Sequence, residues 1–227
     1  MAELIVTIDG PAASGKSTVA RRVATKLDAT FLDTGAMYRA VTLAAVRDGV
    51  DLTQERQLVE VIAAHAFRFE ATREHMSAFV DGADVTEALR APDLTAEVRH
   101  VASNAAAREQ LVRMQRAFAA EHDRVVTEGR DQGTVAFPDA DVKFYLTAAS
   151  AERARRRARD LADQGDAADV EQIQQAIEDR DRSDRERAVG PLRPATGAVV
   201  IDTTGMRVED VVERVVHCVE ERCQENR

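Results

Sequence analysis

The sequence is short of cysteine, and this shortage excludes several kinds of protein. Cys218 and Cys223 are the two cysteines of the 227-residue chain, and five residues apart on one predicted helix they point in different directions. They form no CxxC pair and no metal-ligand spacing, which argues against a disulfide framework or a cysteine metal site. We expect two reduced thiols in a cytoplasmic protein.

Long apolar runs and an excess of basic residues are also missing. No stretch of 18 apolar residues occurs, and no basic segment followed by an apolar core opens the chain, so neither a membrane span nor a secretory signal is predicted. The 31 Lys and Arg are outnumbered by 40 Asp and Glu, a net charge of −9 that argues against a nucleic-acid partner. The length fits one α/β domain with a small inserted lobe.

Short apolar runs alternate with helical patterns along the chain. The first run, residues 4–9 (LIVTID), is closed by Gly-Pro and is typical of a strand buried on both faces of a parallel sheet. The alternation predicts an α/β fold in which helices cover a five-stranded parallel sheet, and such sheets bind ligands beyond the carboxyl ends of their strands. The other predicted strands are 30–32, 125–129, 142–147 and 198–203, and the predicted helices are 17–27, 37–48, 94–121, 150–163, 169–187 and 207–225.

The stretch 67–85 breaks this alternation. Its β-rich flanks surround turn-forming residues, and Asp81-Gly82 is a further turn signal. We interpret it as a small antiparallel insert, and residues 61–105 as a second lobe.

Residues 10–17, GPAASGKS, match the phosphate-binding pattern GxxxxGK[ST] between a predicted strand and a predicted helix. The glycines let the backbone wrap around phosphate oxygens, whose charge is met by amide N–H groups and by the helix N-terminus. Lys16 is expected to reach the β- and γ-phosphates, and the Ser17 hydroxyl to ligate Mg²⁺. The loop predicts a nucleoside triphosphate site made by Gly10, Ala12, Ala13, Ser14, Gly15, Lys16, Ser17 and Thr18.

Four groups of arginines are candidates for binding a second anion. Arg39 follows the DTG turn after the second strand, and Arg130 follows the third strand. Residues 151–159 hold five arginines and residues 180–187 hold four. Arginines near strand ends in so acidic a chain indicate focused recognition of phosphate. For residues 151–159, ion pairing on a helix surface is an equal alternative.

These segments together resemble bacterial-type cytidylate kinase, the (d)CMP kinase branch of the P-loop nucleoside monophosphate kinases. IDGPAASGKS, DTGAMYRA, EGRDQGTVAFPDADVK and DRSDRERAVGPL occur in the family's order and with similar spacing, between about residues 4 and 204. The resemblance implies transfer of the γ-phosphoryl group of MgATP to CMP or dCMP. The domains expected on this basis are a P-loop core (1–60, 106–149 and 191–227), an NMP-binding lobe (61–105) and an arginine-rich helical lid (150–190). We expect a cytoplasmic monomer.

The resemblance also implies roles for the residues that match the family's motifs, and it makes Lys16, Arg130 and Arg187 the catalytic ones. The acceptor phosphate would be held by Arg39, Arg130 and Arg187; Thr34, Arg180 and Asp184 would lie near the ribose hydroxyls or the phosphate; Arg108 and Asp131 would read the base; and Arg153 and Arg157 would lie near ATP.

The chemistry of cytosine agrees with an Asp–Arg base reader. Cytosine offers an amino donor at position 4 and acceptors at N3 and O2, whereas uracil has a carbonyl at position 4 that a carboxylate repels. A structural salt bridge is the alternative role for Asp131. The family's usual serine contact to the base, about nine residues before Arg108, falls at Arg99 here and stays unassigned. Gln132 stands where the family usually has an apolar residue, and Thr34 where it has serine.

Two other functions remain open. One is a P-loop kinase for another small acceptor such as UMP, shikimate or a coenzyme precursor, which would give Arg108 and Asp131 no base to read. The other is a nucleotide-binding switch that transfers no phosphate, which would leave the four arginine groups without a purpose.

Overall fold

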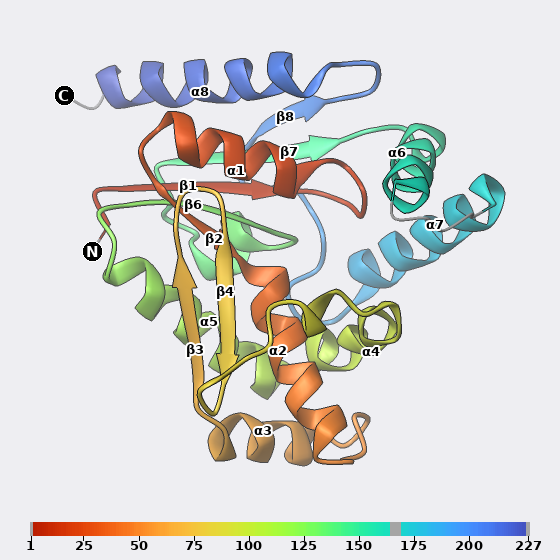
Figure 1. The fold of residues 1–227 in the computed structure, drawn as a ribbon. Coiled ribbons are helices and arrows are strands. Elements are labelled where there is room, and N and C mark those ends of the chain that lie inside the picture. The colour runs from red at the N-terminus through yellow and green to blue at the C-terminus, as the bar shows by residue number, and fades with distance from the viewer. Residues whose placement is uncertain (1, 164–168, 226–227) are drawn as a thin grey trace.

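Two sheets organise the part of the chain that the computed structural model describes, residues 2–163 and 169–225 (Figure 1). The strands are β1 (Leu4–Asp9), β2 (Thr30–Asp33), β3 (Phe67–Ala71), β4 (Met76–Val80), β5 (Ala83–Asp84), β6 (Arg124–Gly129), β7 (Val142–Thr147) and β8 (Val199–Asp202). The helices are α1 (Lys16–Lys26), α2 (Thr34–Arg47), α3 (Glu55–Ala64), α4 (Pro92–Ser103), α5 (Ala105–Ala120), α6 (Ser150–Ala162), α7 (Val170–Glu186) and α8 (Val208–Glu225), with short helical turns η1 (Ala88–Arg90) and η2 (Gln132–Ala136).

The larger sheet confirms the predicted α/β class. Its five strands have the order β2-β6-β1-β7-β8 and are parallel in each pairing. Val6 and Ile8 of β1 are fully buried because helices cover both faces, with α1 and α8 on one side in Figure 1. Parallel pairing brings the strand ends to one edge, where Asp9 pairs with Gly129 and Asp33 with Glu128.

The predicted antiparallel insert is confirmed as the three-stranded sheet β3-β4-β5. Alternation on β4 buries Met76, Ala78 and Val80 in the hydrophobic core that also includes residues of α2 and α5. The expected lobe boundary at residue 61 falls inside α3. Residues 164–168 of the expected lid lie outside the described residues. Among the described helices, none has the length and apolar character to cross a membrane.

The predicted continuous helix over 94–121 is wrong, because the chain breaks at Asn104 into α4 and α5. Asn104 has an extended backbone, and its side-chain oxygen accepts a hydrogen bond from Ala107 N at 2.9 Å. Its amide nitrogen donates to Glu55 O at 3.1 Å. An asparagine that caps a new helix ends the old one while leaving the apolar periodicity almost intact, which is why periodicity alone missed the break.

Replacing this cap should destabilise the protein. We expect Asn104→Ala to lower the free energy of unfolding by about 1–2 kcal/mol, because the Ala107 amide and the Glu55 carbonyl each lose a partner. Urea denaturation measures the change. The neighbouring Ser103 is exposed, so Ser103→Ala should stay within about 0.5 kcal/mol of the wild type. Equal effects of the two changes would contradict the capping role.

Candidate active site

The phosphate-binding loop connects β1 to α1 at the carboxyl edge of the sheet. Gly15 has the left-handed φ of +86° and precedes Lys16, the first residue of α1. No side chain caps this helix end, so its first amide groups are available to an anion. Lys16 is 5% exposed and folds back over the loop, donating to Pro11 O at 2.7 Å. The amine of Lys16 therefore lies buried within the loop itself.

A carboxylate that the sequence reasoning missed lies beside this loop. Glu128 is buried near the end of β6, and its Oε1 accepts a hydrogen bond from Ser17 Oγ at 2.8 Å. The parallel register aligns Glu128 with Ile8, two residues before the loop begins. The signal available in the sequence is an acid near the end of the strand predicted before EGRDQGT. Without the strand order, its pairing with the phosphate-binding strand could not be known.

Asp9, which the sequence reasoning also missed, fixes the turn after β6. Its two carboxylate oxygens accept hydrogen bonds from Gln132 N and Gly133 N, each at 2.8 Å. Burial raises the pKa of Asp9 to about 7, although the two amide hydrogen bonds act in the opposite direction. This carboxylate therefore ties the end of β1 to the turn that carries Arg130 and Asp131.

Gln132 stands where the family usually has an apolar residue, and its hydrogen bonding shows how a polar side chain is accommodated there. The side chain is buried, and its Oε1 accepts a hydrogen bond from Thr127 Oγ1 at 3.0 Å. The polar side chain is thus satisfied within the core. Thr34 is also buried, and its hydroxyl donates to Glu128 O at 2.7 Å, so the extra methyl group relative to serine is accommodated.

The arginines predicted to bind the acceptor phosphate converge from three elements. Arg130 Nε donates to Asp184 Oδ2 of α7 at 2.8 Å. Arg187, just after α7, donates from Nε to Gly190 O at 2.5 Å and lies 3.7 Å from Asp184. Arg180 lies one turn before Asp184 on α7, and Arg39 lies on α2. Arg130 and Arg187 therefore meet at the carboxylate of Asp184, although they are far apart in the sequence. Arg39 lies near enough to Arg180 that its charge lowers the pKa of Arg180.

Arg108 and Asp131, the predicted base readers, form a buried ion pair. Arg108 Nη1 also donates to Ala102 O at 3.2 Å, and its guanidinium lies 5.6 Å from the ring centroid of Tyr38. Arg108 Nε and Arg187 Nη2 are buried without a hydrogen-bond acceptor among the described residues. Buried donors without acceptors indicate a site that a ligand completes. The ion pair itself is compatible with base reading and with the structural alternative.

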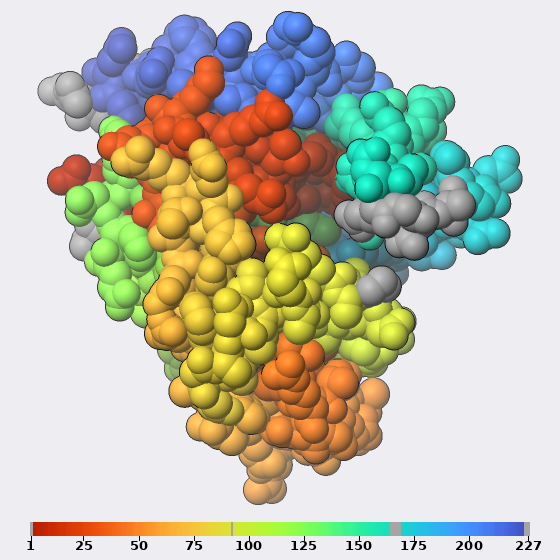
Figure 2. Space-filling view, in the orientation of Figure 1, coloured from red at the N-terminus to blue at the C-terminus, as the bar shows by residue number. Residues whose placement is uncertain are grey.

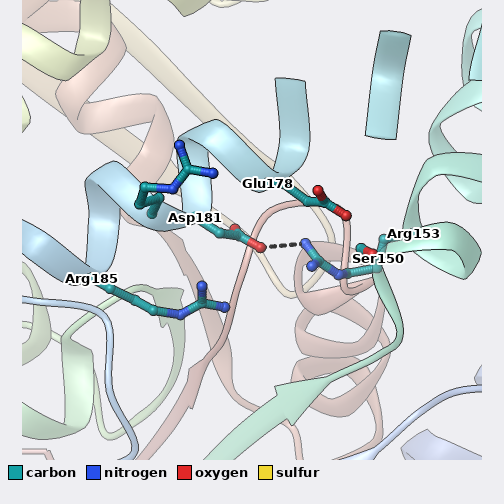
Figure 3. Close-up of a pocket in the computed structure, with 6 residues that line it drawn as sticks. Ser150, Arg153, Glu178, Asp181 and Arg185 are labelled. Carbon is teal, nitrogen blue, oxygen red and sulfur yellow. Dashed lines mark ion pairs between the residues drawn. The ribbon is translucent and has the colours of Figure 1, made fainter. Parts of the chain in front are cut away.

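The two arginines predicted to lie near ATP occupy different environments on α6. Arg153 is 5% exposed and forms an ion pair with Asp181 of α7 at 2.6 Å, drawn as a dashed line in Figure 3. Arg157 is exposed, one turn further along the helix. A polar cavity of about 370 Å³ lies between α6 and α7 and is lined by Ser150, Arg153, Glu178, Asp181, Arg182 and Arg185 (Figure 3). Figure 2 shows the surface hollowed between α6 and the segment that carries η1 and α4.

Three other arginines of residues 151–159 form ion pairs on the helix surface, the alternative to phosphate binding. Arg155, Arg156 and Arg159 all lie within 3.7 Å of the carboxylate of Glu152. Arg156 also donates to Thr203 O at 2.6 Å. These three arginines make ion pairs on and beside α6.

Burial, and after it the charges of neighbouring cations, lower the pKa values of several basic groups in the site. Burial, and then the neighbouring charges of Arg130 and Arg180, lower the pKa of Lys16 to about 7 despite Glu128. Arg180 is solvent-accessible, yet desolvation by the surrounding protein and the charge of Arg130 lower its pKa to about 10. Burial and Arg108 lower the pKa of Arg187. Cations crowded until their pKa values fall indicate a site for highly charged anions.

The fold and the loop define a P-loop phosphotransferase. A family model described as cytidylate kinase matches residues 6–221. The chain belongs to the cytidylate kinase family.

Curated relatives agree over nearly the whole chain. The chain is 44% identical to a cytidylate kinase of Desulfitobacterium hafniense, with 94% of this chain and 91% of the relative covered. It is 48% identical to one of Pelotomaculum thermopropionicum, with 93% of each covered. It is 41% identical to one of Bacillus subtilis, with 97% and 98% covered. Among solved structures, TT1252 from Thermus thermophilus is similar in fold, with a TM-score of 0.51, 19% identity and 97% and 98% of the two chains covered.

The lowered pKa of Lys16 predicts that nucleotide binding takes up protons. Phosphate charge should restore the ammonium form of Lys16, whose pKa is about 7 without ligand, so ATP should bind with proton uptake at pH 8 and with falling affinity from pH 7 to 9. Calorimetry in buffers of different ionisation enthalpy measures the protons. Lys16→Met should abolish the uptake at saturating ATP, whereas the exposed Lys26→Met should keep it. Unchanged uptake in Lys16→Met would assign the titration to another group.

Proposed function

We propose that this protein transfers the γ-phosphoryl group of ATP to the phosphate of CMP or dCMP, giving ADP and CDP or dCDP. One observation carries the proposal: Arg130 and Arg187 meet at Asp184 beside the buried Arg108–Asp131 pair, with Arg187 Nη2 3.8 Å from Asp131 Oδ1. The loop accounts for a donor nucleotide. The arginines beyond the loop can bind a second anion. The buried Arg108–Asp131 pair offers a base both a hydrogen-bond donor and a hydrogen-bond acceptor. The cytidylate kinase relatives support CMP as the source of that anion and base.

The proposed reaction is a direct, in-line displacement. An oxygen of the CMP phosphate attacks the γ-phosphorus of ATP, the bond from that phosphorus to the β-bridging oxygen breaks, and ADP leaves with the electron pair. No general base is needed, because a phosphate monoester is already a competent nucleophile near neutral pH. Positioning and charge neutralisation then supply most of the rate enhancement.

The residues divide this work between the donor and acceptor sides. We assign the donor phosphates to Lys16 and the amide groups of residues 10–18, because that helix end carries no side-chain cap. We assign the acceptor phosphate to Arg39, Arg130 and Arg187, and the adjacent ribose to a region near Thr34, Arg180 and Asp184. We also propose that Arg153 and Arg157 lie near ATP. Closure of the lid over both nucleotides would exclude water that otherwise hydrolyses ATP.

The oxygen groups beside the loop fit Mg²⁺. Ser17 Oγ and the Glu128 carboxylate are hard donors already within 2.8 Å of one another. The described residues contain no cluster of three or more His, Cys, Asp or Glu side chains suited to a metal, which agrees with an ion held mainly by nucleotide phosphates and water. We therefore assign Ser17 and Glu128 to hold Mg²⁺, which when bound would neutralise charge on the donor phosphates.

The proposal places the reaction in the cytoplasm and in a monomer. All of the site residues named here come from a single chain. Light scattering coupled to size exclusion would test the monomeric state.

Acceptor selectivity tests the proposed function. We expect rapid ADP release from MgATP with CMP and dCMP and much weaker release with UMP, because Asp131 can accept a hydrogen bond from the cytosine amino group but repels the uracil carbonyl. AMP, with its larger purine, and shikimate, which has no base, should give none above background. A coupled ADP assay measures all five. Strong activity only with another acceptor would overturn the base assignment, and no stimulation by any of them would favour a nucleotide switch.

Asp131→Asn sharpens this test. The variant should lower kcat/KM for CMP by about 10- to 100-fold and narrow the preference over UMP, because an amide can donate to the uracil carbonyl. The matched control is Asp139→Asn, eight residues further along the chain. Asp139 is exposed, so this variant should keep the wild-type preference for CMP over UMP. An Asp131→Asn variant that loses stability but keeps the wild-type CMP:UMP ratio would identify Asp131 as a structural salt-bridge partner.

Arg130→Ala should affect turnover far more than stability. We expect kcat to fall by at least about 100-fold, since a cation that neutralises the transferred phosphoryl group is lost. The loss of the bond to Asp184 should be partly offset, because Arg130 also repels Lys16 and Arg180. Arg124→Ala, at the far end of β6, is the control for turnover. A melting temperature lowered by tens of degrees in Arg130→Ala would show a structural residue.

A further inference from the structure

Arg153 joins four segments through a single buried guanidinium. Its Nε donates to Ala148 O after β7 at 3.0 Å, and its Nη1 donates to Ala12 O of the phosphate-binding loop at 2.8 Å. The same Nη1 lies 2.6 Å from Oδ2 of Asp181 on α7. Arg153 itself belongs to α6, so its guanidinium connects α6 and α7 to the phosphate-binding loop and to the residue after β7.

Asp181 contacts the same loop residue directly. Its Oδ1 accepts a hydrogen bond from Ala12 N at 3.0 Å, and Asp181 is 1% exposed. The amide of Ala12 therefore donates to Asp181, and the carbonyl of Ala12 accepts from Arg153. Ala12 also packs against Ile177 and Ala154 in a small apolar cluster between α7, α6 and the loop. The loop and the two helices cannot shift independently without breaking this polar and apolar contact.

The position of Asp181 on α7 gives this contact a functional consequence. Arg180 precedes it directly, and Asp184, which binds Arg130, lies three residues further along the same helix. A movement of the loop at Ala12 would therefore move the part of α7 that carries acceptor-side residues. The proposed donor site and the proposed acceptor site are thus connected by a short, buried path.

We propose that Asp181 is a positioning residue that couples the donor site to the acceptor site through its ion pair with Arg153. The inference rests on the proposed function, because it assigns a donor nucleotide to the loop and CMP to the arginines of α7. Asp181 touches neither nucleotide in this proposal. A donor nucleotide that orders the loop around Ala12 also orders α7, so CMP then meets its arginines already in place and binds more tightly.

A binding cycle measures this coupling without catalysis. The dissociation constant of CMP is measured by calorimetry with and without saturating β,γ-imido-ATP, and the ratio of the two values is the coupling factor. In the wild type we expect CMP to bind at least about 5-fold more tightly when the analogue is bound. In Asp181→Asn, which keeps an oxygen for Ala12 N but loses the charge facing Arg153, the factor should fall below about 2-fold.

Asp179→Asn is the matched control. Asp179 lies on the same helix but is exposed and bonds to Gln175 and Arg182, so its loss should leave the coupling factor unchanged. Arg153→Lys is the second variant if Asp181→Asn fails to fold. It keeps the positive charge but loses the guanidinium that reaches three segments, so its coupling factor should also fall. Asp181→Glu, which restores the charge, should recover part of the coupling.

The outcomes separate this inference from the proposed function. A folded Asp181→Asn with the wild-type coupling factor overturns the inference, as does an equal loss of coupling in Asp179→Asn. A wild type that phosphorylates CMP but shows no coupling overturns the inference alone. A wild type that neither phosphorylates nor binds CMP overturns the proposed function, and this inference with it.

Discussion

The burial of cations close to one another is the constraint on which the site depends. Burial is the main reason that the pKa values of Lys16 and Arg180 fall, and the charge of Arg130 lowers both further. Left to themselves, such groups separate or take up water. They stay together because their backbones belong to rigid elements at one edge of a parallel sheet. Under the proposed function, entering phosphate anions would favour the charged forms of these groups.

Carboxylates that are buried or half-buried hold these segments in place. Asp9 holds the turn after β6 through two amide groups, Glu128 accepts a hydrogen bond from Ser17, and Asp184 accepts one from Arg130. Asp181 does the same for the loop at Ala12. The acidic residues behind the net charge of −9 therefore fall into two groups. Many acids lie on exposed helix surfaces, whereas these four contact parts of the site that we propose binds the nucleotides, namely the loop, the turn after β6 and Arg130.

The lobe and the core meet at the start of α5. Asn104 ends α4 and caps α5, so Arg108 falls in the first turn of a new helix, with its backbone N–H donating to Asn104 O at 3.0 Å. From there its side chain reaches Asp131 at the turn after β6 and lies over the ring of Tyr38. The helix that Asn104 caps thus carries Arg108 to the turn after β6.

The sequence by itself determined the α/β class, the phosphate-binding loop, the antiparallel insert and the family, because each is written in local periodicity or in contiguous motifs. The helix break at Asn104 is a local cap that the apolar periodicity concealed, whereas the partners of Asp9, Glu128 and Asp181 were decided only by tertiary structure. Those contacts join residues more than 100 positions apart, and no local pattern encodes which strand ends become neighbours. Strand order and parallel register bring them together, since pairing β6 beside β1 places distant carboxylates and cations at one buried edge.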